Sequence, residues 1–221
     1  MPGATAGSTM HGVKASLALA GLAAALALVA SGCGSAAARR AAAAKPAAPR
    51  CAYRAGWQRL ADRIRAPVYC PGWLPDPLTA QIGGPWNNID EVSPDRSYLE
   101  SFVWQETEVG ANGAGGELHV NLRGYPGRTT IPTCPTGAND TGLEPCFGGP
   151  HGHVLENGIR ATLYTVNQGA DEWHIALLWR HAGSLYTISE HLAPPLDYRK
   201  VVDYLRRELR SLVLIRPAVS T

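Results

Sequence analysis

Histidine is the residue type with the clearest potential for chemistry in this sequence. His151 and His153 stand two positions apart in GGPHGH. In an extended segment, alternate side chains share a face, so both imidazoles could bind one metal ion. The histidines that could complete such a site are His119, His174, His181 and His191. The alternative is that these histidines lie in loops and have no role, because the sequence has no HExxH spacing. We therefore expect neither a metal ion nor another cofactor.

Other residue types give little reason to expect catalysis. Ser184 follows a glycine in a turn and not in a GxSxG elbow, and the glycines of GANGAGG lack the spacing of a phosphate-binding loop. The carboxylates Glu106, Glu108, Asp171 and Glu172 are scattered, and only their separation in space would decide whether a glycosidase pair exists. We therefore expect a protein that is not an enzyme, with a metal-dependent or carbohydrate-active hydrolase as an alternative.

Two tryptophans lie in segments rich in proline and glycine. Trp73 and Trp86 would suit contact with a sugar or peptide if their rings were exposed. The alternative interpretation is that both rings cap the core.

The N-terminal segment has the pattern of an export signal. Lys14 precedes the apolar run ASLALAGLAAALALVA, which is shorter than the ~20 residues that span a bilayer. The run ends in VASGC, where small residues precede Cys33. This ending resembles the lipobox of bacterial lipoproteins, although Ala30 stands where that family usually has leucine. The resemblance implies cleavage after Gly32 and a diacylglycerol on the thiol of Cys33, and the alternative is an ordinary secretory signal with an incidental cysteine.

These features divide the chain into four parts. Residues 1–32 are predicted to be the signal peptide, and residues 33–50 the lipidated cysteine with a basic tether rich in alanine and proline. Residues 51–217 are predicted to form one globular domain, and residues 218–221 a short tail. The location implied by the resemblance is the extracytoplasmic face of the cell membrane, with the lipid on Cys33 as the anchor.

The cysteine count agrees with this location. The chain has five cysteines, so assigning Cys33 to lipid leaves four for disulfides in an oxidising compartment. We favour Cys51–Cys70 and Cys134–Cys146, since each bridge closes a short loop, and the second segment shows no strand pattern of its own. A zinc site with four cysteines is the competing interpretation, which the absence of CxxC spacing disfavours.

The globular part shows helix signals at its two ends and strand signals between them. Residues 56–66 place apolar side chains at helical spacing, and residues 196–214 do so behind Asp197, which can cap the helix. Residues 97–106 and 117–125 are expected to pair as strands, with strict alternation in ELHVNLRGY. The sequence favours two more hairpins, 153–166 turning at Asn157-Gly158 and 172–192 turning at Ala182-Gly183. The predicted fold is α+β, an antiparallel sheet with an N-terminal and a C-terminal helix packed on one face.

Part of this domain is similar to a known kind of module. LLWRHAGSLYTI, followed by an amphipathic helix, and APVYCPGWLPDPL upstream look like small sheet-and-helix domains of unknown function in bacterial lipoproteins and anti-sigma-factor ectodomains. The resemblance implies an extracytoplasmic module in which Trp179, Gly183 and Tyr186 pack and turn a hairpin.

The net charge of the chain indicates which partners to expect. The formal net charge is only +2, so the total gives no support for nucleic-acid binding. We expect a domain that binds an envelope protein, glycan or lipid ligand at the membrane surface. A carrier that encloses an apolar ligand is the first alternative.

Overall fold

The computed structural model describes residues 47–105, 116–135, 142–167 and 174–218, without the side chains of residues 166 and 167. The predicted signal peptide, Cys33 and most of the tether lie outside the described residues. Among the residues that are described, no helix has the length and apolar character needed to cross a membrane.

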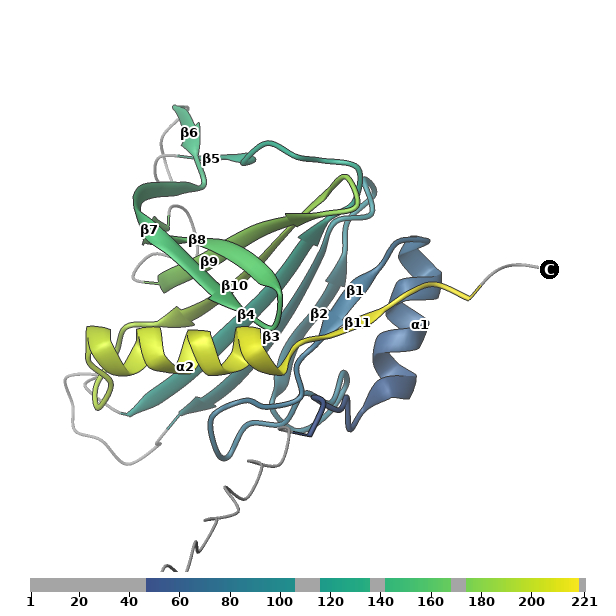
Figure 1. Cartoon of the computed structure of the whole chain (residues 1–221), viewed down its shortest axis with the longest axis horizontal. Helices are drawn as coiled ribbons and strands as arrows, with labels where there is room; N and C mark the ends of the chain where they lie inside the picture. Colours follow the sequence, from purple (N-terminus) through teal and green to yellow (C-terminus); the bar gives the residue numbers. More distant parts are fainter. Residues whose placement is uncertain (1–46, 106–115, 136–141, 168–173, 219–221) are drawn as a thin grey trace, which may run out of the picture. The chain divides into compact units, whose positions relative to one another are not determined.

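A seven-stranded sheet forms the centre of the domain (Figure 1). Every neighbouring pair of strands is antiparallel, in the order β2-β3-β4-β10-β9-β8-β7. The strands are β2 (Asn87–Val92), β3 (Tyr98–Gln105), β4 (Glu117–Tyr125), β7 (Phe147–Glu156), β8 (Ile159–Asn167), β9 (His174–His181) and β10 (Ser184–His191). Two short ladders accompany this sheet, one of β1 (Val68–Cys70) with β11 (Val213–Ile215) and one of β5 (Thr133–Pro135) with β6 (Leu143–Pro145).

The hairpins predicted from the sequence are present. β3 pairs with β4, and the turns at Asn157-Gly158 and Ala182-Gly183 join β7 to β8 and β9 to β10. All four turn residues have positive φ, between 48° and 74°. That conformation matches the right-handed twist of the flanking strands, and the Gly at the second position of each turn adopts it without strain.

Two helices complete the domain. α1 (Arg54–Ile64) begins two residues before the predicted start and ends at Arg65, whose φ of 52° stops the helix. α2 (Tyr198–Ser211) is capped as expected, because the Asp197 carboxylate accepts a hydrogen bond of 2.8 Å from the backbone N–H of Lys200.

The helical periodicity at the C-terminus overestimates the length of α2. Leu212 is already extended, and residues 213–215 form strand β11 against β1. Pairing with a distant strand satisfies these backbone groups, which a frayed last turn of helix would leave without partners.

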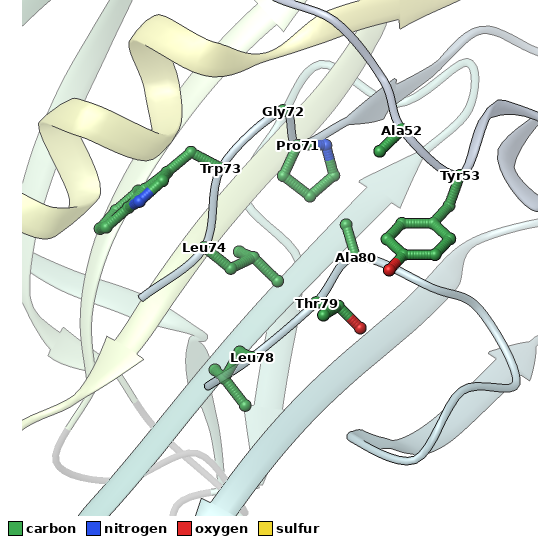
Figure 2. A pocket seen from close by; sticks show the side chains of 9 residues that line it. All are labelled: Ala52, Tyr53, Pro71, Gly72, Trp73, Leu74, Leu78, Thr79 and Ala80. Atoms are coloured by element: carbon green, nitrogen blue, oxygen red, sulfur yellow. The ribbon is translucent and has the colours of Figure 1, made fainter. Parts of the chain in front are cut away.

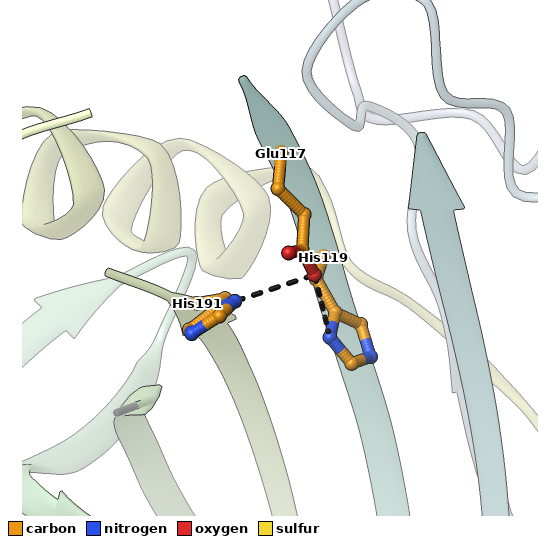
Figure 3. A group of neighbouring side chains, drawn as sticks. All are labelled: Glu117, His119 and His191. Carbon is orange, nitrogen blue, oxygen red and sulfur yellow. Dashed lines mark ion pairs between the residues drawn. The ribbon is translucent and has the colours of Figure 1, made fainter. Parts of the chain in front are cut away.

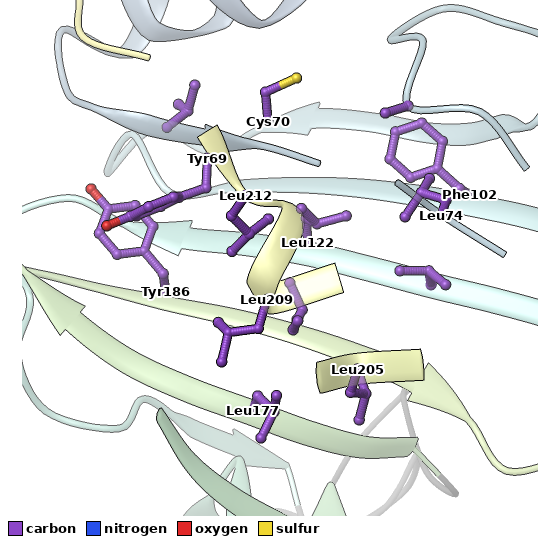
Figure 4. Packing of buried hydrophobic residues seen from close by; sticks show 14 of the residues in the cluster. Tyr69, Cys70, Leu74, Phe102, Leu122, Leu177, Tyr186, Leu205, Leu209 and Leu212 are labelled. Atoms are coloured by element: carbon purple, nitrogen blue, oxygen red, sulfur yellow. The ribbon is translucent and has the colours of Figure 1, made fainter. Parts of the chain in front are cut away.

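The main core lies between the sheet and the helices (Figure 4). Trp57 of α1 packs against Phe102 of β3, with ring centroids 6.5 Å apart, and its indole N–H donates a 2.8 Å hydrogen bond to the carbonyl of Ala80. Leu205 and Leu209 of α2 are fully buried in the same cluster. The cluster also contains Tyr69, Leu122, Leu177 and Tyr186, so the β1–β11 ladder, the large sheet and both helices contribute to it.

A smaller core lies under the β5–β6 ladder. Phe147, Leu178 and Leu185 are buried there with the Cys134–Cys146 disulfide. The prediction that this segment lacks strands is wrong, since Cys134 and Glu144 face each other in a two-stranded ladder. The disulfide holds the two strands together where their side chains alone would not. The second disulfide, Cys51–Cys70, joins the start of the domain to β1.

Candidate metal centre

A histidine and carboxylate cluster lies on the side of the sheet opposite the main core. Along β4, Leu118 and Val120 enter the core, so the alternate residues Glu117 and His119 point to the other face. His191 ends β10, next to β4, and it pairs with His174 of β9. The pairing order of the strands thus gathers side chains from three separate strands.

The ligand atoms of three residues converge (Figure 3). Glu117 Oε1 lies 3.3 Å from His119 Nδ1 and 3.3 Å from His191 Nδ1. All three ligand atoms lie within 4.8 Å of one another. Zinc bonds of ~2.1 Å at a tetrahedral angle separate neighbouring ligand atoms by about 3.4 Å, so the two contacts of Glu117 have the spacing of a zinc site.

A neighbouring hydroxyl orients one of the two imidazoles. Ser101 Oγ lies 2.9 Å from His119 Nε2, so that nitrogen has a partner and Nδ1 is left to face the carboxylate. A hydrogen bond to the second ring nitrogen is the usual support of a metal-bound histidine. The backbone N–H of Glu117 donates to the carbonyl of Pro194, which holds the start of β4 beside the end of β10.

His174 closes the cluster from the side of β9. Its ring stacks on His191 with centroids 5.0 Å apart and meets the edge of His119 at 4.8 Å. It is 3% exposed, whereas the side chains of Glu117, His119 and His191 are about one-fifth exposed. The Nδ1 atom of His191 is itself buried, and the contacts of His174 restrict the positions of both rings.

The arrangement offers one dication three ligand atoms. Each imidazole nitrogen that carries no proton has a lone pair for a metal ion, and the carboxylate adds a negative charge beside them. A divalent metal ion would satisfy both imidazole lone pairs and the carboxylate at once. Two histidines and one carboxylate supply three ligands, which leaves a tetrahedral position for water.

The histidines singled out by their spacing in the sequence lie elsewhere. His151 and His153 are exposed on β7, where His153 Nδ1 contacts Thr162 Oγ1. His181 meets Tyr69, a residue of the main core. The signal in the sequence that points to the cluster is the outward alternation of Glu117 and His119 on β4, but His191 could be added only after the pairing of β4 with β10 was known.

The remaining predicted candidates are placed as follows. Ser184 is buried and accepts a hydrogen bond from the backbone N–H of Gly127, which is a structural role. Glu106, Glu108, Asp171 and Glu172 lie outside the described residues.

Trp73 and Trp86 are both half-buried. The Arg207 guanidinium covers the Trp73 ring at 3.9 Å, and Tyr204 meets it edge-on. The hollow beside Trp73 has a volume of about 210 Å³ (Figure 2). This is below the ~300 Å³ at which ordinary ligand pockets begin, so the hollow is a poor candidate for a sugar site.

Comparison of the chain with protein-family models, with curated proteins and with solved structures finds no match. The interpretation of the site therefore depends on its geometry.

Proposed function

We propose that the chain is an extracytoplasmic lipoprotein, anchored to the membrane through Cys33, whose domain binds a divalent transition-metal ion at Glu117, His119 and His191. The observation that carries the metal assignment is the convergence of two Nδ1 atoms on one carboxylate oxygen. Imidazole and carboxylate together suit Zn²⁺ among the common ions. The role is binding, with no catalytic activity.

The disulfides support the proposed location. Four of the five cysteines pair with one another in the described part of the chain, which leaves Cys33 for the lipid. Disulfides of this kind persist outside the reducing cytosol. We also propose that α1 and α2 cover one face of the sheet. The other face carries the smaller core under the β5–β6 ladder and the metal centre.

The packing of the core supports this function over that of an apolar carrier. Leu177, Leu205 and Leu209 are each fully buried between the sheet and α2. A carrier would need that volume for its ligand.

Zinc titration of the untagged full chain, followed by calorimetry, tests the metal site. We expect wild type to bind one ion, and His191→Ala to bind it at least 10²-fold more weakly, because one of three protein ligands is gone. The matched control is His151→Ala/His153→Ala, which removes two exposed histidines and should leave the affinity unchanged. Circular dichroism verifies that each variant is folded. Absence of zinc binding in wild type, or equal loss in the control, refutes the site.

Cell fractionation tests the anchor separately. Cys33→Ser should leave the membrane fraction or remain as an uncleaved precursor. A variant that fractionates and migrates like wild type refutes lipidation, whatever the zinc titration shows.

A further inference from the structure

The exposed side chains of the two helices are mostly basic. α1 and α2 carry eight exposed arginine or lysine residues and only two exposed carboxylates, Asp62 and Asp203. The whole chain has a formal net charge of +2, so the total conceals this concentration of positive charge. The eight residues, which we call the basic helix layer, are Arg54, Arg59, Arg63, Arg199, Lys200, Arg206, Arg207 and Arg210.

Only part of this charge is neutralised within the protein. Arg206 and Arg210 both pair with Glu156, at 2.9 Å each. Arg54, Arg59 and Arg199 make no ion pair with another residue of the described part of the chain. Since unpaired arginines on the exposed sides of the two helices create a positive potential there, the basic helix layer suits a polyanionic partner.

The chain enters the domain close to the start of α1. The Cys51–Cys70 disulfide fixes the start of the domain beside β1, and α1 begins three residues after Cys51. Residues 34–50 would reach about 50 Å if fully extended at ~3.1 Å per residue. The tether is therefore long enough to let the basic helix layer turn toward the membrane.

We propose that the basic helix layer docks on the anionic headgroups of the membrane that holds the anchor. This inference depends on the proposed lipidation of Cys33. Lys and Arg side chains near an anionic leaflet each strengthen binding about fivefold, so the three unpaired arginines together would favour the docked domain by about 10²-fold. Glu117 and His119 lie on the opposite face of the sheet from α2, so docking would point the metal centre away from the bilayer.

Neutron reflectometry of the lipidated full chain on supported bilayers tests the proposal. On bilayers that contain an anionic lipid, we expect the density of the domain to lie directly against the headgroups. On zwitterionic bilayers, or in high salt, we expect the density to move outward toward the reach of the tether, because salt screens exposed charges. The variant Arg54→Glu/Arg59→Glu/Arg199→Glu should lower the ratio of docked to undocked domain by at least about 10²-fold on anionic bilayers.

A matched control makes the same change of charge away from the helices. Arg96→Glu/Arg160→Glu/Arg180→Glu alters three exposed arginines of the turn before β3, of β8 and of β9, and should leave the domain docked. The proposal is overturned if the distance between the domain and the headgroups does not depend on lipid charge. It is also overturned if the control variant undocks as much as Arg54→Glu/Arg59→Glu/Arg199→Glu. If the wild-type protein binds duplex DNA more tightly than anionic vesicles, the proposal is also overturned, and the basic helix layer is assigned to a polynucleotide.

Failure of the anchor is distinguishable from failure of docking. If Cys33 carries no lipid, a high-salt wash removes the chain from every bilayer, yet charge-dependent binding to anionic vesicles at low salt would still support the basic helix layer. If the anchor is present and docking fails, the chain stays on the bilayer through the wash with its domain at the same distance on both lipids.

Discussion

Two buried carboxyl groups between the sheet and α2 make the stability of this protein depend on pH. Glu190 of β10 is fully buried and Glu208 of α2 is 1% exposed. Neither carboxyl has a hydrogen-bond partner among the described residues. Burial raises the pKa of Glu208 to about 8. Burial, with a further contribution from the charge of Glu208, raises the pKa of Glu190 to about 10, which Lys200 partly offsets.

The direction of the effect follows from proton linkage. The unfolded chain releases the proton of Glu208 near its ordinary pKa of 4.5, while the folded chain keeps it until about pH 8. The stabilisation is therefore complete below pH 4.5 and is lost progressively as the pH rises toward 8. One such carboxyl lowers the free energy of unfolding by on the order of 1 kcal/mol per pH unit in that window, or about 2–3 kcal/mol from pH 5.5 to 7.5.

Glu208→Gln removes the part of this dependence that comes from Glu208. Because the amide does not titrate, the free energy of unfolding of the variant relative to wild type should rise by about 2–3 kcal/mol between pH 5.5 and 7.5. A buried amide without partners costs ~1–3 kcal/mol, so we expect the variant to be less stable than wild type at pH 5.5 and at least comparable at pH 7.5. Urea unfolding followed by tryptophan fluorescence at the two pH values measures the difference.

Glu156→Gln is the matched control. Hydrogen bonds from Arg210 and Arg206 lower the pKa of Glu156, so this carboxyl is ionised at both pH values. Its loss should change stability by the same amount at pH 5.5 and 7.5. Burial also raises the pKa of Glu100, to about 9, but this effect is common to wild type and Glu208→Gln and cancels in their difference. If Glu208→Gln keeps the pH dependence of wild type, Glu208 is ionised in the folded protein and the reasoning fails.

Three further substitutions test the packing. Gly124→Ala should destabilise the domain by ~1–3 kcal/mol, because the new Cβ would overlap the ring of Tyr98 on the paired strand; a melting temperature equal to wild type would contradict this packing. Gly56→Ala, whose Cβ would meet Ile82 at an ordinary 3.4 Å within α1, should instead stabilise by up to about 1 kcal/mol in the same thermal melt. Trp57→Phe leaves the buried carbonyl of Ala80 without its donor and should cost ~1–3 kcal/mol in urea unfolding, and an unchanged midpoint would rule out that hydrogen bond.

Local signals predicted much of this fold. The strand β4 was evident from strict alternation, and the turn at Asn157-Gly158 from a residue pair that tolerates positive φ. Asp197 marked the start of α2 through a hydrogen bond that spans only three residues. Each of these features depends on neighbours in the sequence, so a single sequence contains the information needed to predict it.

The short ladders were not predictable in the same way. β1 and β11 have three residues each and pair with each other, although they come from opposite ends of the domain's sequence. A run of three residues has too little periodicity to distinguish a strand from the last turn of a helix, which is why residues 213–215 were assigned to α2. Their strand conformation depends on a partner that is distant along the chain.

The sequence by itself determined the periodic helices and strands, the hairpin turns, the short loops that the disulfides close, and the apolar N-terminal run that ends at Cys33. Tertiary structure decided which histidines meet. His151 and His153 are close in the sequence but exposed on β7, whereas His119 and His191 are distant in the sequence and both contact Glu117. The reason is that β4 pairs with β10 across the sheet, and the register between strands that are not consecutive depends on the packing of the whole domain.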